Sequence, residues 1–214
     1  MKEQNNCYLM DDIFSAGIVA GFTKNTLGGD LPGDMKRELG QTQVAYLDQP
    51  HSADIVYTEK EGLFHGDGLL TKKKGLALVI KTADCLPVFL EEPEEGIFGI
   101  IHMGWRSAES GILDGIGIDL SRAKVAAGPG MRRCCYQMGR EFRRSPAIGP
   151  FLKEEQGRYY FDPVRFLREA LVKKGLRKEN FFDLGICSFC SGLDVFSYRR
   201  TGTSLRTLSF ILHK

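Results

Sequence analysis

Two histidines and one cysteine have the types that could support chemistry: His51 in QPHSAD, Cys85 in KTADCLPV and His102 in IIHMGWR. Each lies where an apolar segment begins or ends, and functional sites are commonly built at such ends. Two imidazoles and one thiolate suit zinc, and three protein ligands leave the fourth tetrahedral position open for water or substrate. The set therefore predicts a catalytic metal site, although spacing alone does not join the three residues and each could instead fill a core.

The segments around these residues read as buried strands. Residues 76–80, 86–90 and 97–101 are short, β-branched and bounded by Gly, Pro or charge, a pattern typical of strands and too short for helices. Cys85 falls between the first two segments, and His102 directly follows the third. Residues 181–187 and 205–212 predict a last strand pair.

Two helices are expected. Asp162 can accept hydrogen bonds from a first turn, Pro163 fits the first helical position, and Val164, Leu167 and Leu171 form an apolar stripe that ends before Gly175. After Trp105, the spacing of Ile112, Leu113, Ile116 and Leu120 is also helical, although the intervening glycines each weaken that helix by about 1 kcal/mol. Strands and helices are thus interspersed, which predicts a mixed α and β class.

Composition predicts an ordinary globular protein. The 214 residues are 43% hydrophobic and 26% charged, with no repeat or Gly/Pro-rich linker, which favours one domain over residues 1–214. No apolar run approaches the roughly 20 residues of a membrane span, and the first residues lack a secretion signal, so we expect no membrane partner and a cytoplasmic location. Six cysteines in such a chain predict ligands, nucleophiles or core fillers rather than disulfides.

Five sequence strings resemble one known family. QPHSADIV, GLALVIKTADCLPVFL, IFGIIHMGWRSAESGIL, AAGPGMRRCCYQMGREF and DVFSYRRTG occur in that order and are similar to the YfiH-like laccase-domain family, also called the polyphenol oxidase domain family. The resemblance runs from about Gln49 to the end of the chain. It implies an α+β fold, a single compact domain with mixed β-sheets flanked by helices, and a metal bound by His51, Cys85 and His102.

The resemblance also implies an activity. Members phosphorolyse purine nucleosides and methylthioadenosine with zinc, and deaminate adenosine, so the expected partners are inosine, adenosine or methylthioadenosine together with phosphate. The catalytic residues would be His51, Cys85 and His102. A zinc-bound water with a pKa near 7 would serve deamination, whereas phosphorolysis needs cations beside the phosphate.

Three further residues are candidates for substrate binding. Arg106 lies four residues beyond His102 and could clamp phosphate. Asp84, beside Cys85, could orient a histidine, move a proton or cap a turn. Lys24 in GFTKNTLGGD stands where the family usually has arginine, and the two side chains are not equivalent at an anion.

Two rival functions use the same residues. Cys85 activated by a histidine could be the nucleophile of a cysteine hydrolase acting on an amide such as a cell-wall precursor. A copper-dependent polyphenol oxidase is disfavoured, because four histidines are too few for the several coppers of such an enzyme. A single copper with Met103 as axial ligand would require adjacent residues to bind together, which is poor geometry.

Two other patterns point elsewhere. Cys187 and Cys190 have the CxxC spacing of half a zinc site or a redox pair, but a lone CxxC is weak evidence; we interpret Cys187 as a strand-end residue and leave Cys190 unassigned. The arginines at 132, 133, 140, 143, 144, 199 and 200 could contact nucleic acid. Because 29 basic residues are balanced by 27 acidic ones and no binding motif is recognisable, we expect no nucleic-acid partner.

Overall fold

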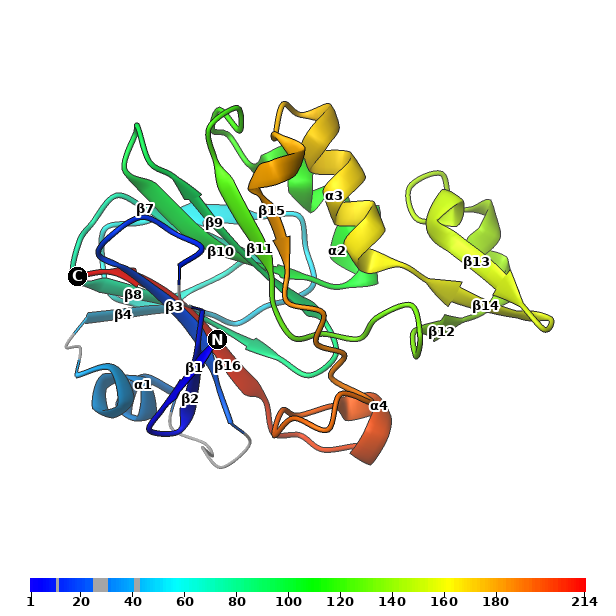
Figure 1. Ribbon diagram of the computed structural model, residues 1–214, viewed down its shortest axis with the longest axis horizontal. Coiled ribbons are helices and arrows are strands. Elements are labelled where there is room, and N and C mark those ends of the chain that lie inside the picture. The colour runs from blue at the N-terminus through cyan, green and yellow to red at the C-terminus, as the bar shows by residue number, and fades with distance from the viewer. Residues whose placement is uncertain (11, 25–30, 41–42) are drawn as a thin grey trace.

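Two stacked β-sheets form the centre of the computed structural model, which describes residues 1–10, 12–24, 31–40 and 43–214 (Figure 1). The larger sheet has the order β1 (Lys2–Gln4), β2 (Cys7–Leu9), β3 (Ile18–Thr23), β16 (Thr207–His213), β8 (Leu76–Thr82), β4 (Gln43–Leu47) and β6 (Gly62–Phe64). The second has the order β15 (Phe181–Asp183), β11 (Lys124–Ala127), β9 (Leu86–Glu92), β10 (Ile97–Met103), β7 (Gly68–Thr71) and β5 (Ile55–Tyr57). Both sheets contain parallel and antiparallel pairs.

A small third sheet projects to one side, at the right of Figure 1. It consists of β12 (Gln137–Met138), β14 (Arg158–Phe161) and β13 (Leu152–Glu155). Short 3-10 turns at Arg140–Arg144 and Gly149–Phe151 connect β12 to β13, and another at Lys178–Asn180 leads into β15. The two remaining short helices are α2 (Trp105–Glu109) and α4 (Tyr198–Thr201).

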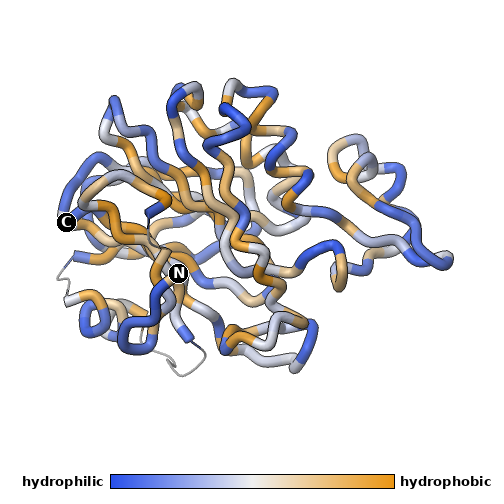
Figure 2. The backbone as a smooth tube through the Cα atoms, in the orientation of Figure 1, coloured by the Kyte–Doolittle hydropathy of each residue, from blue (hydrophilic) through white to orange (hydrophobic). Residues whose placement is uncertain are grey.

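Strand β8 shows why the central segments read as continuous apolar runs. Leu76, Leu78 and Ile80 face the second sheet, where they pack against Phe89 and Phe98. The alternate residues of β8 face the other way, into a cluster that contains Met35 of helix α1 (Leu31–Leu39). Because both faces of the strand are buried, apolar residues follow one another without alternation. The apolar colouring of the central strands in Figure 2 follows this burial.

Helix α3 (Pro163–Lys173) covers the outer face of the second sheet. Its buried Phe166, Leu167 and Leu171 join the same cluster as Leu86 of β9. At its start, the Asp162 carboxylate accepts a hydrogen bond of 3.0 Å from the backbone N–H of Arg165. The predicted helix, with its cap and its proline at the first position, is confirmed. The order of layers is therefore helix, sheet, sheet, helix, and the α+β class is confirmed.

The helix expected after Trp105 is wrong as a continuous element. Helix α2 ends at Glu109, Gly111 adopts a left-handed backbone with φ of 81°, and a single 3-10 turn follows at Ile112–Gly115. Ile112, Leu113, Ile116 and Leu120 are nevertheless all buried in one cluster. The spacing of these four residues therefore reflects their burial and not a helix. The glycines between them destabilise a continuous helix.

The expected pairing of residues 181–187 with 205–212 is also wrong. β15 pairs in parallel with β11 in the second sheet, whereas β16 lies between β3 and β8 in the larger sheet. Both segments form strands, but their closeness in the sequence does not determine which strands they pair with. Among the described residues, no helix is long and apolar enough to span a bilayer.

Candidate active site

His51, Cys85 and His102 converge. One ligand atom from each of them lies within 4.8 Å of those of the other two. The Cys85 Sγ is 3.8 Å from the His51 Nε2, and the two imidazole rings meet edge to face with centroids 4.8 Å apart. Residues separated by up to 51 positions therefore form one cluster that could bind a metal.

Strand directions explain the convergence. β4 and β8 run parallel, so the loop that carries His51 beyond β4 and the turn that carries Cys85 beyond β8 leave the sheet at the same edge. β9 and β10 are antiparallel, with His102 opposite Pro87, which places the end of β10 beside Cys85. The Gln49 side chain ties the first loop to β8 through two hydrogen bonds of 2.7 Å with the backbone of Lys81.

Backbone conformation at the cluster is unusual in two places. His51 has φ of 66° and Asp84 has φ of 93°, both in the left-handed region that non-glycine residues rarely adopt. A side chain at Gly104 would begin 2.9 Å from the Cys85 Sγ and 3.2 Å from the His51 ring. The glycine of the HMGWR string is thus required by the close approach of the cluster.

Asp67 orients His102. Its fully buried carboxylate lies 2.7 Å from the His102 Nδ1 and accepts a 2.5 Å hydrogen bond from the backbone N–H of Ser52, next to His51. Carboxylate contacts of this kind fix the tautomer and orientation of metal-binding histidines. The backbone N–H of His102 also donates to the Asp67 carbonyl at 2.7 Å. His102 consequently presents its Nε2 toward the remaining members of the cluster.

The cluster forms a thiolate–imidazolium pair when no metal neutralises it. Burial acts to raise the pKa of Cys85, but the facing His102 and His51 outweigh it and lower that pKa to about 6. Burial acts to lower the pKa of His102, but Cys85 and Asp67 outweigh it and raise that pKa to about 9. Each partner favours the charged form of the other, so the sulfur is a thiolate at neutral pH.

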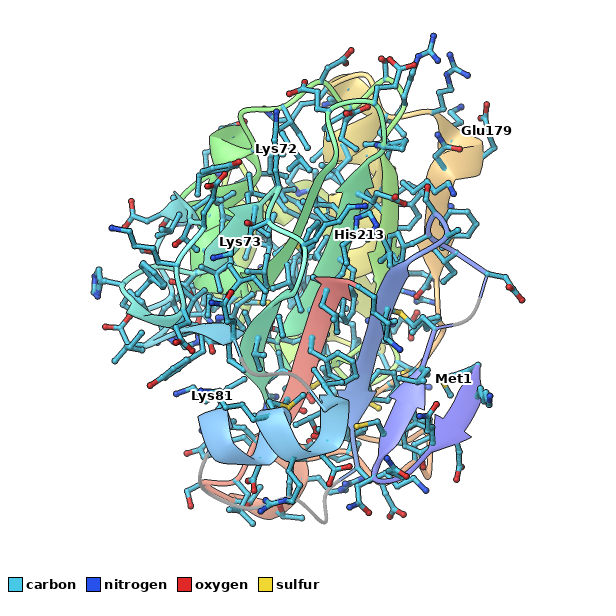
Figure 3. The ribbon with its side chains drawn as sticks, turned by 90° about the vertical axis from the view of Figure 1, so that its left-hand side faces the viewer. Met1, Lys72, Lys73, Lys81, Glu179 and His213 are labelled. Atoms are coloured by element: carbon cyan, nitrogen blue, oxygen red, sulfur yellow. The ribbon has the colours of Figure 1, made fainter. Side chains whose placement is uncertain are left out.

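The cluster opens into a cavity of about 650 Å³. Four cationic side chains line it: Lys81, Arg106, Arg199 and Arg206. Lys81 is near the C-terminal end of β8, whereas Lys72 and Lys73 come before the strand begins. Figure 3 accordingly shows Lys81 well apart from those two lysines. The aromatic lining consists of Trp105, Tyr136 and Tyr198. Cations together with aromatic faces suit a ligand that is both anionic and planar.

Tyr136 is a neutral donor in this wall. Its side chain is buried, and burial raises its pKa, with the negative charge of Cys85 acting in the same direction. The phenol therefore keeps its proton over the physiological pH range. In the same lining, the guanidinium of Arg106 lies over the Trp105 ring, 4.6 Å from its centroid.

The three predicted substrate residues have different placements. Arg106 lines the cavity, as expected from its distance to His102. Asp84 also lines it, but its carboxylate accepts 2.7 Å hydrogen bonds from the Ser188 hydroxyl and from the backbone N–H of Arg199. Asp84 thus holds the C-terminal loop, while Asp67 orients the histidine. Lys24 pairs with Glu3 at 2.7 Å and is not among the residues that line the cavity.

Sequence reasoning missed Asp67, Lys81, Tyr136 and Arg206, and it read Arg199 only as part of a charged run. An acidic residue one position before a buried strand, as in HGDGLL, is the one signal that could have singled out Asp67. The others reach the cavity from the end of β8, from the segment between β11 and β12 and from the residue before β16, and no local pattern marks them. Arg132 of the arginine run is buried and pairs with Asp183 at 3.0 Å, and so it is not part of a basic surface.

The remaining histidines and Met103 lie away from the cluster. His65 pairs with Asp48 at 2.8 Å, and the His213 ring packs against Phe98. Met103 is buried in an apolar cluster together with Leu86, on the strand face opposite to His102. The described residues include all four histidines, and only two of them meet, so the donors for several coppers are not assembled.

An α+β fold of two stacked mixed sheets, with a His-Cys-His cluster that could bind a metal, defines the class. The family model described as multi-copper polyphenol oxidoreductase laccase matches residues 34–214. This chain belongs to that family.

Relatives and solved structures agree with the family. A purine nucleoside phosphorylase of Clostridium acetobutylicum is 33% identical over 205 residues, covering 87% of this chain and 84% of that protein. One of Deinococcus radiodurans is 32% identical, covering 73% of this chain and 64% of that protein, slightly under two thirds of its length. An adenosine deaminase, RL5, from an unknown prokaryotic organism is 27% identical, covering 84% and 74%.

The fold is that of known structures. YlmD from Geobacillus stearothermophilus superposes with a TM-score of 0.89 at 26% identity, covering 100% of this chain and 98% of that one. The Bacillus licheniformis protein YfiH superposes with a TM-score of 0.83 at 23% identity, covering 98% and 97%. The YfiH-like fold expected from the sequence strings is therefore confirmed.

Proposed function

We propose that this chain is a zinc-dependent purine nucleoside phosphorylase that acts on inosine, adenosine or methylthioadenosine, with adenosine deamination as a companion reaction. The observation that carries the proposal is the His51–Cys85–His102 cluster at the base of a cavity lined by four cations and three aromatic rings. Relatives named purine nucleoside phosphorylase and adenosine deaminase support it.

The donor set of the cluster fits zinc. The Cys85–His51 separation of 3.8 Å is close to the edge of a tetrahedron with bonds of about 2.0–2.3 Å. The Cys85 thiolate is available because its pKa is lowered to about 6, and His102 is held by Asp67 through its other nitrogen. His51, Cys85 and His102 would hold the ion. When bound there, zinc would supply Lewis acidity and lower the pKa of a water to about 7.

Phosphorolysis transfers a sugar from a base to phosphate. A phosphate oxygen bonds to the anomeric carbon while the bond from that carbon to the base breaks, and the base keeps the electron pair and takes a proton. The task of this chain's residues is to hold the dianionic phosphate against that carbon. Arg106 and Lys81, with Arg199 and Arg206, line the cavity and would neutralise the phosphate charge.

The base and the sugar need a planar surface and a hydrogen-bond donor. The Trp105 ring is fixed by its edge-to-face contact with Phe142 at 4.9 Å and by the guanidinium of Arg106. Tyr136, kept neutral by burial, offers a hydroxyl donor within the same cavity. We assign base stacking to Trp105 or Tyr198 and hydrogen bonding to Tyr136.

The decisive experiment combines metal analysis with a substrate assay. Protein purified without chelator is assayed for phosphate-dependent release of hypoxanthine from inosine, with Cys85→Ala as the test variant and Cys7→Ala as the matched control. Cys7 is a buried thiol in a different cluster from the cavity. We expect release by the unmodified and control proteins only.

Each alternative predicts a distinct result. Release of base without phosphate, or at an unchanged rate in Cys85→Ala, would overturn the proposal. Full activity in metal-free protein together with loss in Cys85→Ala would identify the cysteine hydrolase, because the thiolate–imidazolium pair also suits a nucleophile.

A further inference from the structure

Four of the six cysteines gather at a second place in the fold. Cys134 and Cys135 belong to a turn between β11 and β12, and Cys187 and Cys190 belong to the loop that follows β15. Their four sulfur atoms all lie within 4.8 Å of one another. The CxxC of the second loop thus has a partner pair in the first loop, which sequence spacing alone does not reveal.

The sulfur separations fit a shared ion. Zinc–sulfur bonds of about 2.3 Å in a tetrahedron place the sulfurs ~3.8 Å apart. The Sγ atoms of Cys134 and Cys190 are 3.7 Å apart, whereas a disulfide needs about 2.05 Å. All six cysteines are free thiols. Soft thiolates in fours are the ligand set of structural zinc.

Main-chain hydrogen bonds hold the two loops in this arrangement. The backbone N–H of Gly130 donates to the Ile186 carbonyl at 3.2 Å, and that of Ser188 donates back to the Gly130 carbonyl at 3.1 Å. Within the turn, the N–H groups of Cys135 and Tyr136 both donate to the Arg132 carbonyl at 2.9 Å. The consecutive cysteines lie in a turn, not in a strand, so their side chains need not point to opposite sides.

The Cys187 sulfur is surrounded by donors. Backbone N–H groups of Arg132, Cys190 and Phe189 lie near the sulfur and favour its charged form. Two of these N–H groups come from the CxxC segment itself. Donors of this kind stabilise the charged form of a sulfur ligand and fix its direction.

A buried cation beside the cluster lacks its full set of partners. Arg132 is only 9% exposed, and its Nε and Nη1 have no hydrogen-bond partner among the described residues. Its Nη2 donates to the Gly128 carbonyl at 2.6 Å and to the Asp183 carboxylate at 3.0 Å. Four thiolates around one divalent ion carry a net double negative charge, which would compensate this guanidinium.

We propose that Cys134, Cys135, Cys187 and Cys190 form a closed all-thiolate site for a structural zinc ion, separate from the His-Cys-His cluster. The site would fasten the turn that leads to the cavity wall to the loop that supports Asp84. Tyr136, which lines the cavity, follows Cys135 directly, and Ser188, which holds Asp84, follows Cys187. Because every position is filled by a thiolate, the ion would support structure and not chemistry.

Metal stoichiometry in the full chain tests the site. Protein purified without chelator should contain two zinc ions per chain. The variant Cys134→Ser/Cys190→Ser should contain one, as should Cys85→Ala, and the combined variant should contain none. Cys7→Ala, which removes a thiol elsewhere, should retain both. Loss of zinc from Cys134→Ser/Cys190→Ser should also lower the midpoint of thermal unfolding.

Spectroscopy on a variant that keeps the four thiols guards against misfolding of the serine variant. Zinc X-ray absorption of Cys85→Ala should show four sulfur neighbours at about 2.3 Å. Three outcomes would each overturn the proposal: zinc content unchanged by Cys134→Ser/Cys190→Ser, nitrogen neighbours in Cys85→Ala, or a denatured mass two hydrogens lighter from a disulfide. One zinc per unmodified chain that Cys85→Ala keeps and Cys134→Ser/Cys190→Ser loses would support this site and count against metal at the His-Cys-His cluster. None of these outcomes depends on the phosphorylase assay.

Discussion

The two cysteine-containing clusters differ in how the chain assembles them. His51, Cys85 and His102 come from three separate segments, and their three donors leave one side open to a cavity. Cys134, Cys135, Cys187 and Cys190 come from two loops and supply four donors of one kind. An open set of three suits catalysis and a closed set of four suits structure. The number of donors and the space beside them therefore separate two sites that both contain cysteine.

The largest expected effect is that of Cys85→Ala on catalysis. Loss of a thiolate ligand from the open cluster should reduce kcat/KM for inosine phosphorolysis by about 10³-fold, because several kcal/mol of transition-state stabilisation depend on the ion. Steady-state kinetics measures the loss. A reduction of less than tenfold would contradict a catalytic role for the open cluster, because Cys85 would then behave as a structural thiol.

Asp67→Asn should give the next largest effect. The carboxylate within 2.7 Å of the His102 Nδ1 orients the ring, and such supporting contacts are worth about 10–100-fold in metal affinity or activity. Competition with a chromophoric chelator would report a weaker open site, while zinc at the four-cysteine cluster stays bound. Equal weakening of both sites would contradict the assignment of Asp67 to one of them.

Arg106→Ala should raise the KM for phosphate about tenfold, since a charge-assisted hydrogen bond contributes about 1.5–3 kcal/mol. Arg144→Ala is the matched control, because Arg144 is a basic residue outside the lining of this cavity. The measurement is initial rate against phosphate concentration at saturating inosine. If both variants shift KM equally, general electrostatic attraction explains the effect and Arg106 is not a specific clamp.

Alkylation of metal-stripped protein should distinguish the thiols by pH. The pKa of Cys85 is lowered from 9.0 to about 6, so its thiolate persists at pH 7 and is lost as the pH falls through 6. Its rate with iodoacetamide should fall about tenfold between pH 7 and pH 5. Burial raises the pKa of Cys134 to about 11, so that thiol should react slowly at pH 7. Peptide mass spectrometry measures the alkylation rate of each thiol separately. Equal rates at pH 7 would contradict the expected difference in pKa between Cys85 and Cys134.

The smallest effect is expected where the two clusters connect. Ser188→Ala removes the hydroxyl that donates to Asp84 at 2.7 Å and leaves a buried carboxylate oxygen without this donor. The free energy of unfolding should fall by about 1–3 kcal/mol. Denaturant titration measures it, with Ser191→Ala, at an exposed position in the same loop, as control. An unchanged free energy of unfolding would show that the hydrogen bond between Ser188 and Asp84 does not stabilise the protein.

Much of the candidate site could be predicted from the sequence. His51, Cys85 and His102 were predicted as one set, and Arg106 as part of the rim, from residue types and from the resemblance of their surrounding strings to a family. The cavity's other cations were missed, because Lys81, Arg199 and Arg206 lie in unremarkable strand-end and loop sequences. The four-cysteine cluster was missed because its two halves lie more than 50 residues apart.

Local interactions are what the amino-acid sequence determined by itself. The cap at Asp162, the proline at the start of α3 and the runs of β8, β9 and β10 depend on neighbouring residues, and each was predicted. Tertiary structure alone decided that β15 and β16 join different sheets, and that Asp67 reaches His102. These outcomes depend on which distant surface buries a segment, and this information is spread over the whole chain.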